Sequence, residues 1–301
     1  MPSQPPAVWQ LDFYRRPLQG ADGKPLWELL ICDAAMDFTY GEFCPQPQVG
    51  APWIQQQLEI ARDRAGDWPQ AIEIFRPQTV SLVEVACREL PVKVHPTRAV
   101  PTLKRWLHQR AVWYSTLDNY IRGNYINGTS ETNGLEPYEP TNLERPAPQP
   151  MPDHVMGDGW QFAAISPSDL QRLAQEPIPI CSFPTEITPL SLGLSSTQPI
   201  PGIIIDGGRQ SMMLAQWLQS ADPVMMQYIP GPPDGLLLEA GLIDRWILAT
   251  FQDDEVARAA RTFTERKLAA QGLHFLLVRP DDSGMTYTGL WLLQATDSKQ
   301  V

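Results

Sequence analysis

The chain has 301 residues, of which 43% are hydrophobic and 19% are charged, so it is long enough for two packed domains and apolar enough to bury a sizeable interior. Its formal net charge of −11 excludes RNA binding through overall charge, so any RNA-binding surface has to be local. Residues 1–150 hold 14 Lys/Arg and 17 Asp/Glu, whereas residues 151–301 hold 9 and 17, so a basic surface is expected in the first half.

The sequence does not indicate a membrane or secreted protein. No apolar run approaches the ~20 residues that span a bilayer. The N-terminal sequence MPSQPPAVWQLDFYRR resembles neither a secretory signal nor an Arg/Ser-rich transit peptide. We therefore expect a soluble, cytoplasmic protein without membrane insertion.

The four cysteines are far apart in the sequence. They form no CxxC motif, and no Cys/His spacing suits zinc. We expect four reduced thiols, mostly in core positions, and neither a metal nor a cofactor. The four are Cys32, Cys44, Cys87 and Cys181.

The first half alternates strand and helix patterns. A Gly/Asp turn, QGADGK, separates the first two apolar strands and indicates a hairpin. Pro101 is compatible with a helix because it falls in the first turn. In chain order, strands are predicted at 9–15, 26–32, 71–75 and 91–95, and helices at 53–65, 79–90 and 98–111.

Residues 123–153 are rich first in Gly, Asn, Thr and Ser and then in proline, with six prolines between 137 and 152. Such a composition is typical of a semi-rigid linker. The predicted domains are therefore residues 1–122 and 154–301.

The second half also alternates strands and helices, and Ser166 is the expected cap of its first helix. Both halves therefore indicate α/β or α+β domains with mixed sheets. Strands are predicted at 160–165, 202–205, 235–239, 245–251, 273–279 and 288–294, and helices from 166 to about 175, at 209–219 and at 253–271.

A repeated pattern leaves open a duplication of one α/β unit. Arg98 and Arg209 are each followed by Leu five residues later and by Trp-Leu eight and nine residues later, after a strand that begins with proline. The elements occur in a different order in the two halves, so coincidence among common strand–helix patterns is the alternative.

Residues 88–110 form a local basic segment, with six Lys/Arg and one acid. In the helix predicted at 98–111, Leu103, Trp106 and Leu107 share one face, so the basic side chains point away from it. Basic groups beside aromatic rings suit single-stranded RNA, because charges hold the backbone and rings stack on bases. A solvated helix face beside core aromatics is the alternative. The predicted RNA-binding residues of this segment are Arg98, Lys104, Arg105, His108, Trp113 and Tyr114.

Arg209 is a further candidate, because it ends a DGGR turn between a strand and a helix. Backbone N–H groups at a helix N-terminus can hold a phosphate. However, Asp206 at the cap position would occupy those donors itself, so a simple N-cap is the favoured alternative.

No motif predicts an enzyme. The sequence has no GxSxG elbow, and none of its four histidines pairs with a Ser or Cys in a recognisable motif. His274 is expected to be a hydrogen-bonded interior residue, and residues 265–267 a solvated helix face. Asp33 and Glu73, expected on neighbouring strands, could share a divalent metal in a nuclease-like fold, but Phe75 stands where such a nuclease would have lysine.

Five strings carry a resemblance that runs along the whole chain. They resemble the Tab2/Atab2 family of RNA-binding factors. The resemblance is specific because the strings are long and unusual, occur in the order expected for the family, and cover both halves of the chain. The strings are WELLICD (27–33), IEIFRPQ (72–78), RAVPTLKRWLHQR (98–110), GLLLEAGLIDRWILATF (235–251) and GLHFLLVRPDDSGMTYTGLWLL (272–293).

The resemblance implies an RNA-binding protein that supports translation of a photosystem mRNA and photosystem biogenesis, here in its cyanobacterial form. Its expected partners are single-stranded, A/U-rich leader RNA and photosystem or translation proteins. Two alternatives stay open: a protein-binding assembly factor that docks through an acidic surface, and a relic metal-dependent nuclease.

Overall fold

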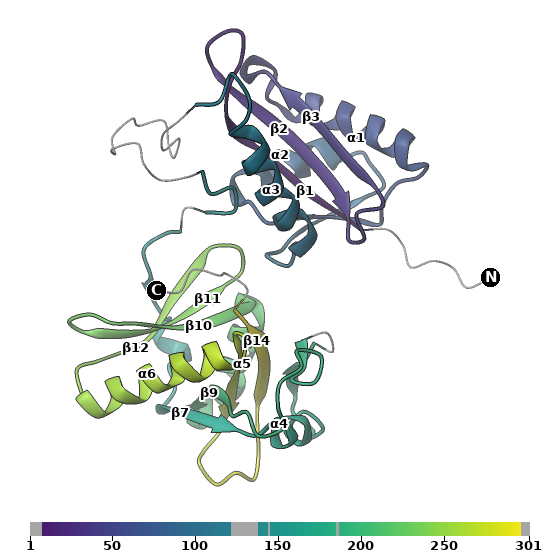
Figure 1. Ribbon diagram of the computed structural model, residues 1–301. Coiled ribbons are helices and arrows are strands. Elements are labelled where there is room, and N and C mark those ends of the chain that lie inside the picture. Colours follow the sequence, from purple (N-terminus) through teal and green to yellow (C-terminus); the bar gives the residue numbers. More distant parts are fainter. Residues whose placement is uncertain (1–7, 122–137, 144, 185–186, 296–301) are drawn as a thin grey trace. The chain divides into compact units, whose positions relative to one another are not determined.

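The computed structural model describes residues 8–121, 138–143, 145–184 and 187–295 (Figure 1). The chain divides into two compact units, Met1–Glu144 (unit 1) and Arg145–Val301 (unit 2). Each unit has its own sheets and its own buried core. Both are built from helices and mixed sheets, which confirms the predicted fold class.

Unit 1 is built on one mixed sheet with the strand order β3-β2-β1-β4-β5. The first three strands form an antiparallel meander, and β4 and β5 are added in parallel at the β1 edge. Its strands are β1 (Val8–Gln19), β2 (Pro25–Asp33), β3 (Thr39–Cys44), β4 (Ala71–Ile74) and β5 (Lys93–Pro96).

Helices cover both faces of this sheet. Alternate residues of β1 point to opposite faces and contribute to a core on each side. Trp9, Leu11 and Phe13 join the larger core, to which α1 and α2 contribute. The other face packs against α3 in a smaller core built around Leu103 and Leu107. The helices are α1 (Ala51–Ala65), α2 (Pro77–Cys87) and α3 (Pro101–Tyr114), with the short 3-10 helix η1 (Gln46–Gln48) before α1.

Residues 138–143, which we name the return segment, belong to unit 1. The carbonyl oxygen of Pro140 accepts a hydrogen bond of 2.8 Å from Arg76, and the Tyr138 ring lies 6.2 Å from the Tyr114 ring. Leu143 packs against the core beneath α3. Of the rest of the expected linker, residues 123–137 and 144 lie outside the described residues, while residues 145–153 belong to unit 2.

Unit 2 has two sheets. The larger has the order β7-β9-β13-β14-β8, with β9 and β13 parallel, and the smaller has the order β10-β11-β12-β6. The larger sheet contains β7 (Gly159–Ile165), β8 (Ile180–Ser182), β9 (Ile200–Asp206), β13 (Leu273–Arg279) and β14 (Gly289–Gln294). The smaller contains β6 (Gln149–Pro150), β10 (Pro223–Ile229), β11 (Asp234–Ala240) and β12 (Asp244–Phe251).

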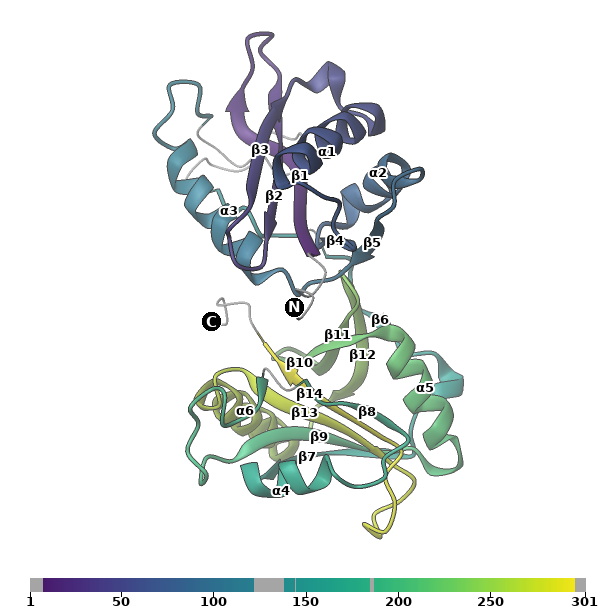
Figure 2. The same ribbon diagram turned by 90° about the vertical axis from the view of Figure 1, so that its right-hand side faces the viewer.

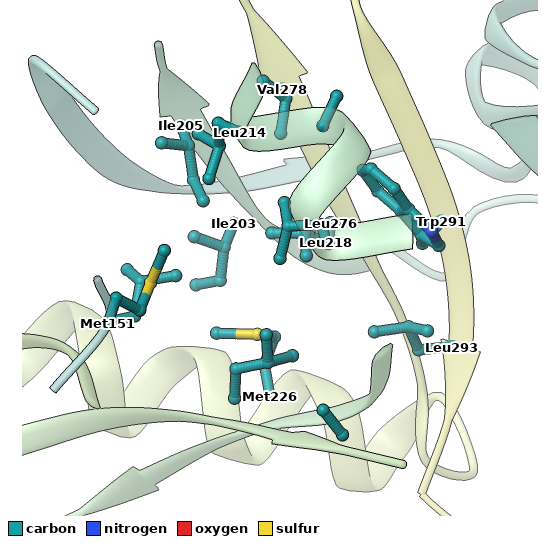
Figure 3. Packing of buried hydrophobic residues seen from close by; sticks show 14 of the residues in the cluster. Met151, Ile203, Ile205, Leu214, Leu218, Met226, Leu276, Val278, Trp291 and Leu293 are labelled. Carbon is teal, nitrogen blue, oxygen red and sulfur yellow. The ribbon is translucent and has the colours of Figure 1, made fainter. Parts of the chain in front are cut away.

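The main core of unit 2 lies where side chains of both sheets meet α5. Figure 3 shows Leu214 and Leu218 of α5 pointing toward Ile203 and Leu276, with Met226 of β10 across from them. The helices of unit 2 are α4 (Pro167–Leu173), α5 (Ser211–Ala221) and α6 (Asp254–Ala269), together with the 3-10 helices η2 (Asp153–Val155) and η4 (Gly208–Gln210).

The predicted helices and apolar strands are present in both units, while β3, β6, β8 and β10 were not predicted. β3 was missed because TYGEFC alternates only weakly in polarity, although Tyr40 and Cys44 are buried. The two units also differ in the number of their sheets and in the strand order within them, so the topology gives no support to a duplication.

Membrane insertion finds no support in the helices. Within the described parts of the chain, none combines the length and the hydropathy needed to cross a bilayer.

Candidate nucleic-acid interface

Helix α3 is anchored to the sheet at its first turn by two side chain–backbone hydrogen bonds. The Leu103 N–H donates to Gln10 Oε1 of β1 over 2.9 Å, and the Thr102 hydroxyl donates to the Ala34 carbonyl over 2.9 Å. Gln10 therefore supplies the acceptor that a local cap would otherwise provide, because Val100 at the N-cap position has no such side chain. The outer face of α3 is thereby fixed relative to β1.

The outer face of α3 exposes Arg105 and His108. His108 faces the return segment: its Nδ1 lies 3.5 Å from Glu139 Oε1, and its Nε2 lies 3.5 Å from Thr141 Oγ1. Arg98 and Lys104 are only half-buried, and each also interacts with other groups of the protein. The structure thus places all four predicted residues in or just before α3, with Arg105 and His108 the most exposed.

The basic segment 88–110 does not form one continuous face. Arg88 directly follows α2, which packs into the core on the opposite side of the sheet from α3. Arg110 is bound to the buried Glu28 carboxylate and is only partly exposed. The net charge of +5 counted along the sequence is therefore divided among two faces of the sheet and its interior.

Trp113 lies at the end of α3 in a stack of aromatic and cationic groups. Its ring centroid is 6.4 Å from that of Phe43 of β3, with the planes 22° apart. The guanidinium of Arg110 lies 4.0 Å from the Trp113 ring centroid, within cation–π range. Trp113 is 39% exposed, so an indole held in place by two neighbours still faces solvent.

Tyr114 was predicted to stack on bases, and its position argues against that role. It is fully buried, and its hydroxyl donates to Glu28. Burial raises the pKa of its phenol well above the usual value, so it stays a neutral donor. Helical spacing separates the two residues, because Tyr114 follows Leu103 by eleven residues, about 20° around the helix, and so shares its buried face. This signal was missed because the predicted helix ended at residue 111.

Beneath α3 lies an ionic network that the sequence did not reveal. Arg16 contacts Asp12 over 2.8 Å and Glu28 over 3.2 Å, and Arg76 contacts Asp12 over 2.8 Å. Burial by itself would raise the pKa of Asp12, but the charges of Arg76 and Arg16 outweigh it and hold that pKa below its usual value. The network is completed by Arg110 and Tyr114, both of which also lie against the Trp113 ring.

Arg209 is exposed, but it belongs to unit 2, and nothing groups it with α3. The predicted N-cap was wrong: Gly207 and Gln210 precede η4 and α5 without a side-chain cap, and Asp206 binds Arg279 over 2.5 Å. The Gly207 and Gly208 N–H groups donate to backbone carbonyls of residues 279 and 280, so these donors are not available to a phosphate.

Asp33 and Glu73 do not form a shared site. They lie on β2 and β4, which β1 separates, so the expectation of neighbouring strands was wrong. Asp33 accepts a hydrogen bond from the Asp37 N–H, and Glu73 accepts one from Gln10. In the part of the chain that the structure describes, no group of three or more His, Cys, Asp or Glu side chains could hold a metal ion.

In unit 2, His274 is a buried hydrogen-bonded residue, as predicted. Its Nε2 accepts from the Met226 N–H over 2.9 Å, and its Nδ1 lies 2.8 Å from the Gly272 carbonyl, which assigns the proton to Nδ1. Burial, with a smaller effect from Lys267, lowers its pKa to about 3.

Lys267 contradicts the prediction of a solvated helix face at residues 265–267. It is 1% exposed, and its amine donates to the Met226 carbonyl over 2.8 Å. Burial lowers its pKa to about 8, against the attraction of Glu239. Three of the four thiols are buried as expected, with Cys181 exposed, and burial raises the pKa of Cys44 and Cys87 to about 11.

Two family models match the chain. The N-terminal model of RNA-binding protein Tab2/Atab2 matches residues 8–110, and the C-terminal domain model of the same family matches residues 138–294. The chain belongs to the Tab2/Atab2 family.

Two plant members of the Tab2/Atab2 family are similar over nearly the whole chain. The "Protein TAB2 homolog, chloroplastic" of Zea mays is 27% identical over 290 residues, which cover 95% of this chain and 70% of that protein. The protein of the same name from Arabidopsis thaliana is 26% identical over 289 residues, which cover 95% and 74%.

Among solved structures, a chain of a simian T-cell lymphotropic virus intasome complex aligns with a TM-score of 0.28 at 13% identity. The alignment covers 53% of this chain and 65% of that chain, which is less than two thirds. A similarity of this size carries no inference about fold or function.

The two Tab2/Atab2 matches divide the interface unequally. The N-terminal match ends at Arg110, so it includes Arg105 and His108 and excludes Trp113. The C-terminal match begins at Tyr138, although the return segment packs on unit 1.

Phe43 was missed by sequence reasoning because it lies 70 residues from Trp113 on a strand without a clear pattern.

Proposed function

We propose that this protein binds single-stranded RNA through the outer face and end of α3, and that it thereby supports translation of a photosystem mRNA and photosystem biogenesis. Membership in the Tab2/Atab2 family supports the RNA-binding part, because both matching models describe RNA-binding proteins. The photosystem role rests on the resemblance to that family. The observation that carries the site is the partly exposed Trp113, held by Phe43 and Arg110 beside the basic face of α3.

The chemistry of this face suits an unpaired strand. Arg105 would contact the phosphate backbone, with His108 three residues later on the same face of α3. Trp113 offers a flat ring to one base, and stacking tolerates any base because every base has a π face. A duplex would hide its base faces from such a ring, so the proposed ligand is single-stranded. The choice of an A/U-rich leader rests only on the resemblance to the Tab2/Atab2 family.

The other predicted residues have different places in this proposal. Arg98 and Lys104 would line the phosphate path at the start of α3, where both are half-buried. Tyr114 is left out as a stacking residue because it is buried. Arg209 is also left out, because it lies in unit 2 and its neighbouring N–H groups are occupied.

The test measures fluorescence anisotropy of a labelled A/U-rich leader RNA with the full chain over a range of salt concentrations. Stacking of one base is worth about 1–3 kcal/mol, so Trp113→Ala should weaken binding about 5- to 150-fold. Arg105→Ala should make the negative slope of log K against log salt less steep by about 0.7, since one phosphate contact is lost.

The matched control is Arg258→Ala, which removes an exposed arginine from a helix of unit 2. It should leave both the affinity and the salt slope unchanged. The proposal fails if the chain does not bind this RNA at low salt, or if the Arg258 and Arg105 variants behave alike. A reporter that carries a photosystem-subunit leader then tests translation separately from binding.

A further inference from the structure

Four methionine side chains project into solvent from unit 2. Met156, Met212, Met213 and Met285 are 50%, 42%, 47% and 83% exposed, and they are four of the ten large exposed hydrophobic side chains among the described residues. We name these four residues the methionine surface. Methionine is flexible and polarizable, so it packs against apolar partners of different shape and is frequent on surfaces that bind amphipathic helices.

The segments that carry these residues meet at the ends of the parallel strands β9 and β13. The Asp158 N–H donates to the Asp206 carbonyl over 2.7 Å, and the Gly207 N–H donates to the Arg279 carbonyl over 2.8 Å. The residues after η2, the turn that leads into η4 and α5, and the beginning of the β13–β14 loop are therefore joined. Figure 2 shows α5 and that loop toward the same end of these strands. Carboxyl ends of parallel strands are common places for binding.

Exposed carboxylates accompany the methionines on two of these three segments, the one around η2 and the β13–β14 loop. Asp206 and Arg279 neutralise each other, and Arg209 adds one exposed positive charge. The local balance is negative, as it is for residues 151–301 as a whole, which hold 9 Lys/Arg and 17 Asp/Glu. The exposed carboxylates are those of Asp153, Asp158, Asp281 and Asp282.

We propose that the methionine surface docks a basic amphipathic helix of a protein partner. The apolar side of such a helix would cover the thioether chains, and its Lys and Arg side chains would face the four carboxylates. RNA is disfavoured here, because the carboxylates would repel its phosphates. This proposal does not depend on RNA binding by α3, since it concerns residues of unit 2 alone.

Methyl NMR of the full chain with carbon-13-labelled methionine methyl groups tests the proposal directly. The probe is an amphipathic peptide of leucine and lysine, about 18 residues or five helical turns long. Adding it should shift the methyl signals of all four residues of the methionine surface. The buried Met226 and the exposed Met36 of unit 1 serve as internal controls and should not shift.

Two double variants distinguish binding at the methionine surface from non-specific hydrophobic binding. Met212→Gln with Met213→Gln keeps helix-forming residues in α5 and should weaken peptide binding about tenfold. The matched control is Leu190→Gln with Leu268→Gln, which removes two exposed leucines elsewhere in unit 2 and should have no effect.

Charge is tested with a third variant and with other ligands. Asp281→Asn with Asp282→Asn should weaken binding and reduce its salt dependence. A scrambled peptide of equal composition should bind much more weakly than the amphipathic one. Equal binding of the two peptides, equal shifts at Met36, or displacement of the peptide by poly-uridine RNA would overturn the proposal.

Discussion

Both units bury charged or titratable side chains, but they satisfy them in different ways. Unit 1 buries Asp12, Arg16 and Glu28 as partners of one another beneath α3. Unit 2 buries His274 and Lys267, and each bonds to the backbone of Met226. It also buries one paired carboxylate, Glu239, which contacts the partly exposed Arg145 over 2.7 Å. The pKa values follow this difference, because paired charges hold Asp12 ionised, whereas burial drives His274 toward its neutral form.

Burial and charge pairing therefore act separately on stability. A buried carboxylate with two arginine partners stays charged, and removing one member leaves the others without compensation. A buried imidazole without an opposite charge stays neutral and so needs no charged partner, but the stability of the unit then depends on pH. Unit 1 should therefore be vulnerable to substitution, and unit 2 to acid.

The largest expected effect is that of Asp12→Ala in unit 1. The substitution leaves Arg16 and Arg76 buried without their shared carboxylate, and breaking such a pair costs about 3–5 kcal/mol. Urea unfolding followed by tryptophan fluorescence measures the loss. The control is Asp63→Ala, whose pair with Arg62 is solvent-exposed and which should cost less than about 1 kcal/mol. Equal losses for the two variants would mean that pairing beneath α3 does not stabilise unit 1.

The second effect is acid sensitivity of unit 2 through His274. Its folded pKa of about 3 lies below the value of 6.5 expected when unfolded, so the unfolded chain takes up the proton first as pH falls. Stability is therefore complete above pH 6.5 and is lost as pH falls toward 3, by roughly 2 kcal/mol at pH 5. Thermal unfolding between pH 5 and 8 should show this slope in the wild type and lose most of it in His274→Gln. An unchanged slope in the variant would assign the acid sensitivity to other groups.

A smaller effect is expected where the return segment meets unit 1. Tyr138→Ala removes an edge-on contact with Tyr114 and should lower the stability of unit 1 by about 1 kcal/mol. Hydrogen exchange of β1 and α3 amides gives the readout. Pro146→Ala, an exposed change just beyond this segment, should have no effect. If Tyr138→Ala leaves exchange unchanged, the return segment lies on unit 1 without stabilising it.

The smallest effect is expected for an exposed ion pair of unit 2. Arg172 and Asp169 contact each other over 2.8 Å on α4 with both side chains largely in solvent. Arg172→Ala should lower stability by less than about 1 kcal/mol, and the difference should shrink further in 1 M salt. A loss comparable with that of Asp12→Ala would show that distance, and not burial, decides what an ion pair contributes here.

Much of the fold could be predicted because amphipathic helices and apolar strands have patterns that a short stretch of sequence reveals. The face of α3 built on Leu103 and Leu107 was correct, since residues three and four apart share a side of a helix. β10 and β3 were harder, because their burial comes from neighbouring strands and not from their own pattern. Lys267 lies four residues after Phe263 on the buried face of α6, so its burial follows the helical pattern, whereas its partner, the Met226 carbonyl of β10, is set by the tertiary fold.

By itself, the sequence determined the order of most elements, the amphipathic α3, and the strings that place the chain in the Tab2/Atab2 family. Each of these depends on residues close together along the chain. Only the tertiary structure decided that Trp113 stacks on Phe43 and that Arg110 pairs with Glu28 across 82 residues. The physical reason is that charge pairing and ring stacking depend on distance and burial, which distant residues acquire only when the chain has folded.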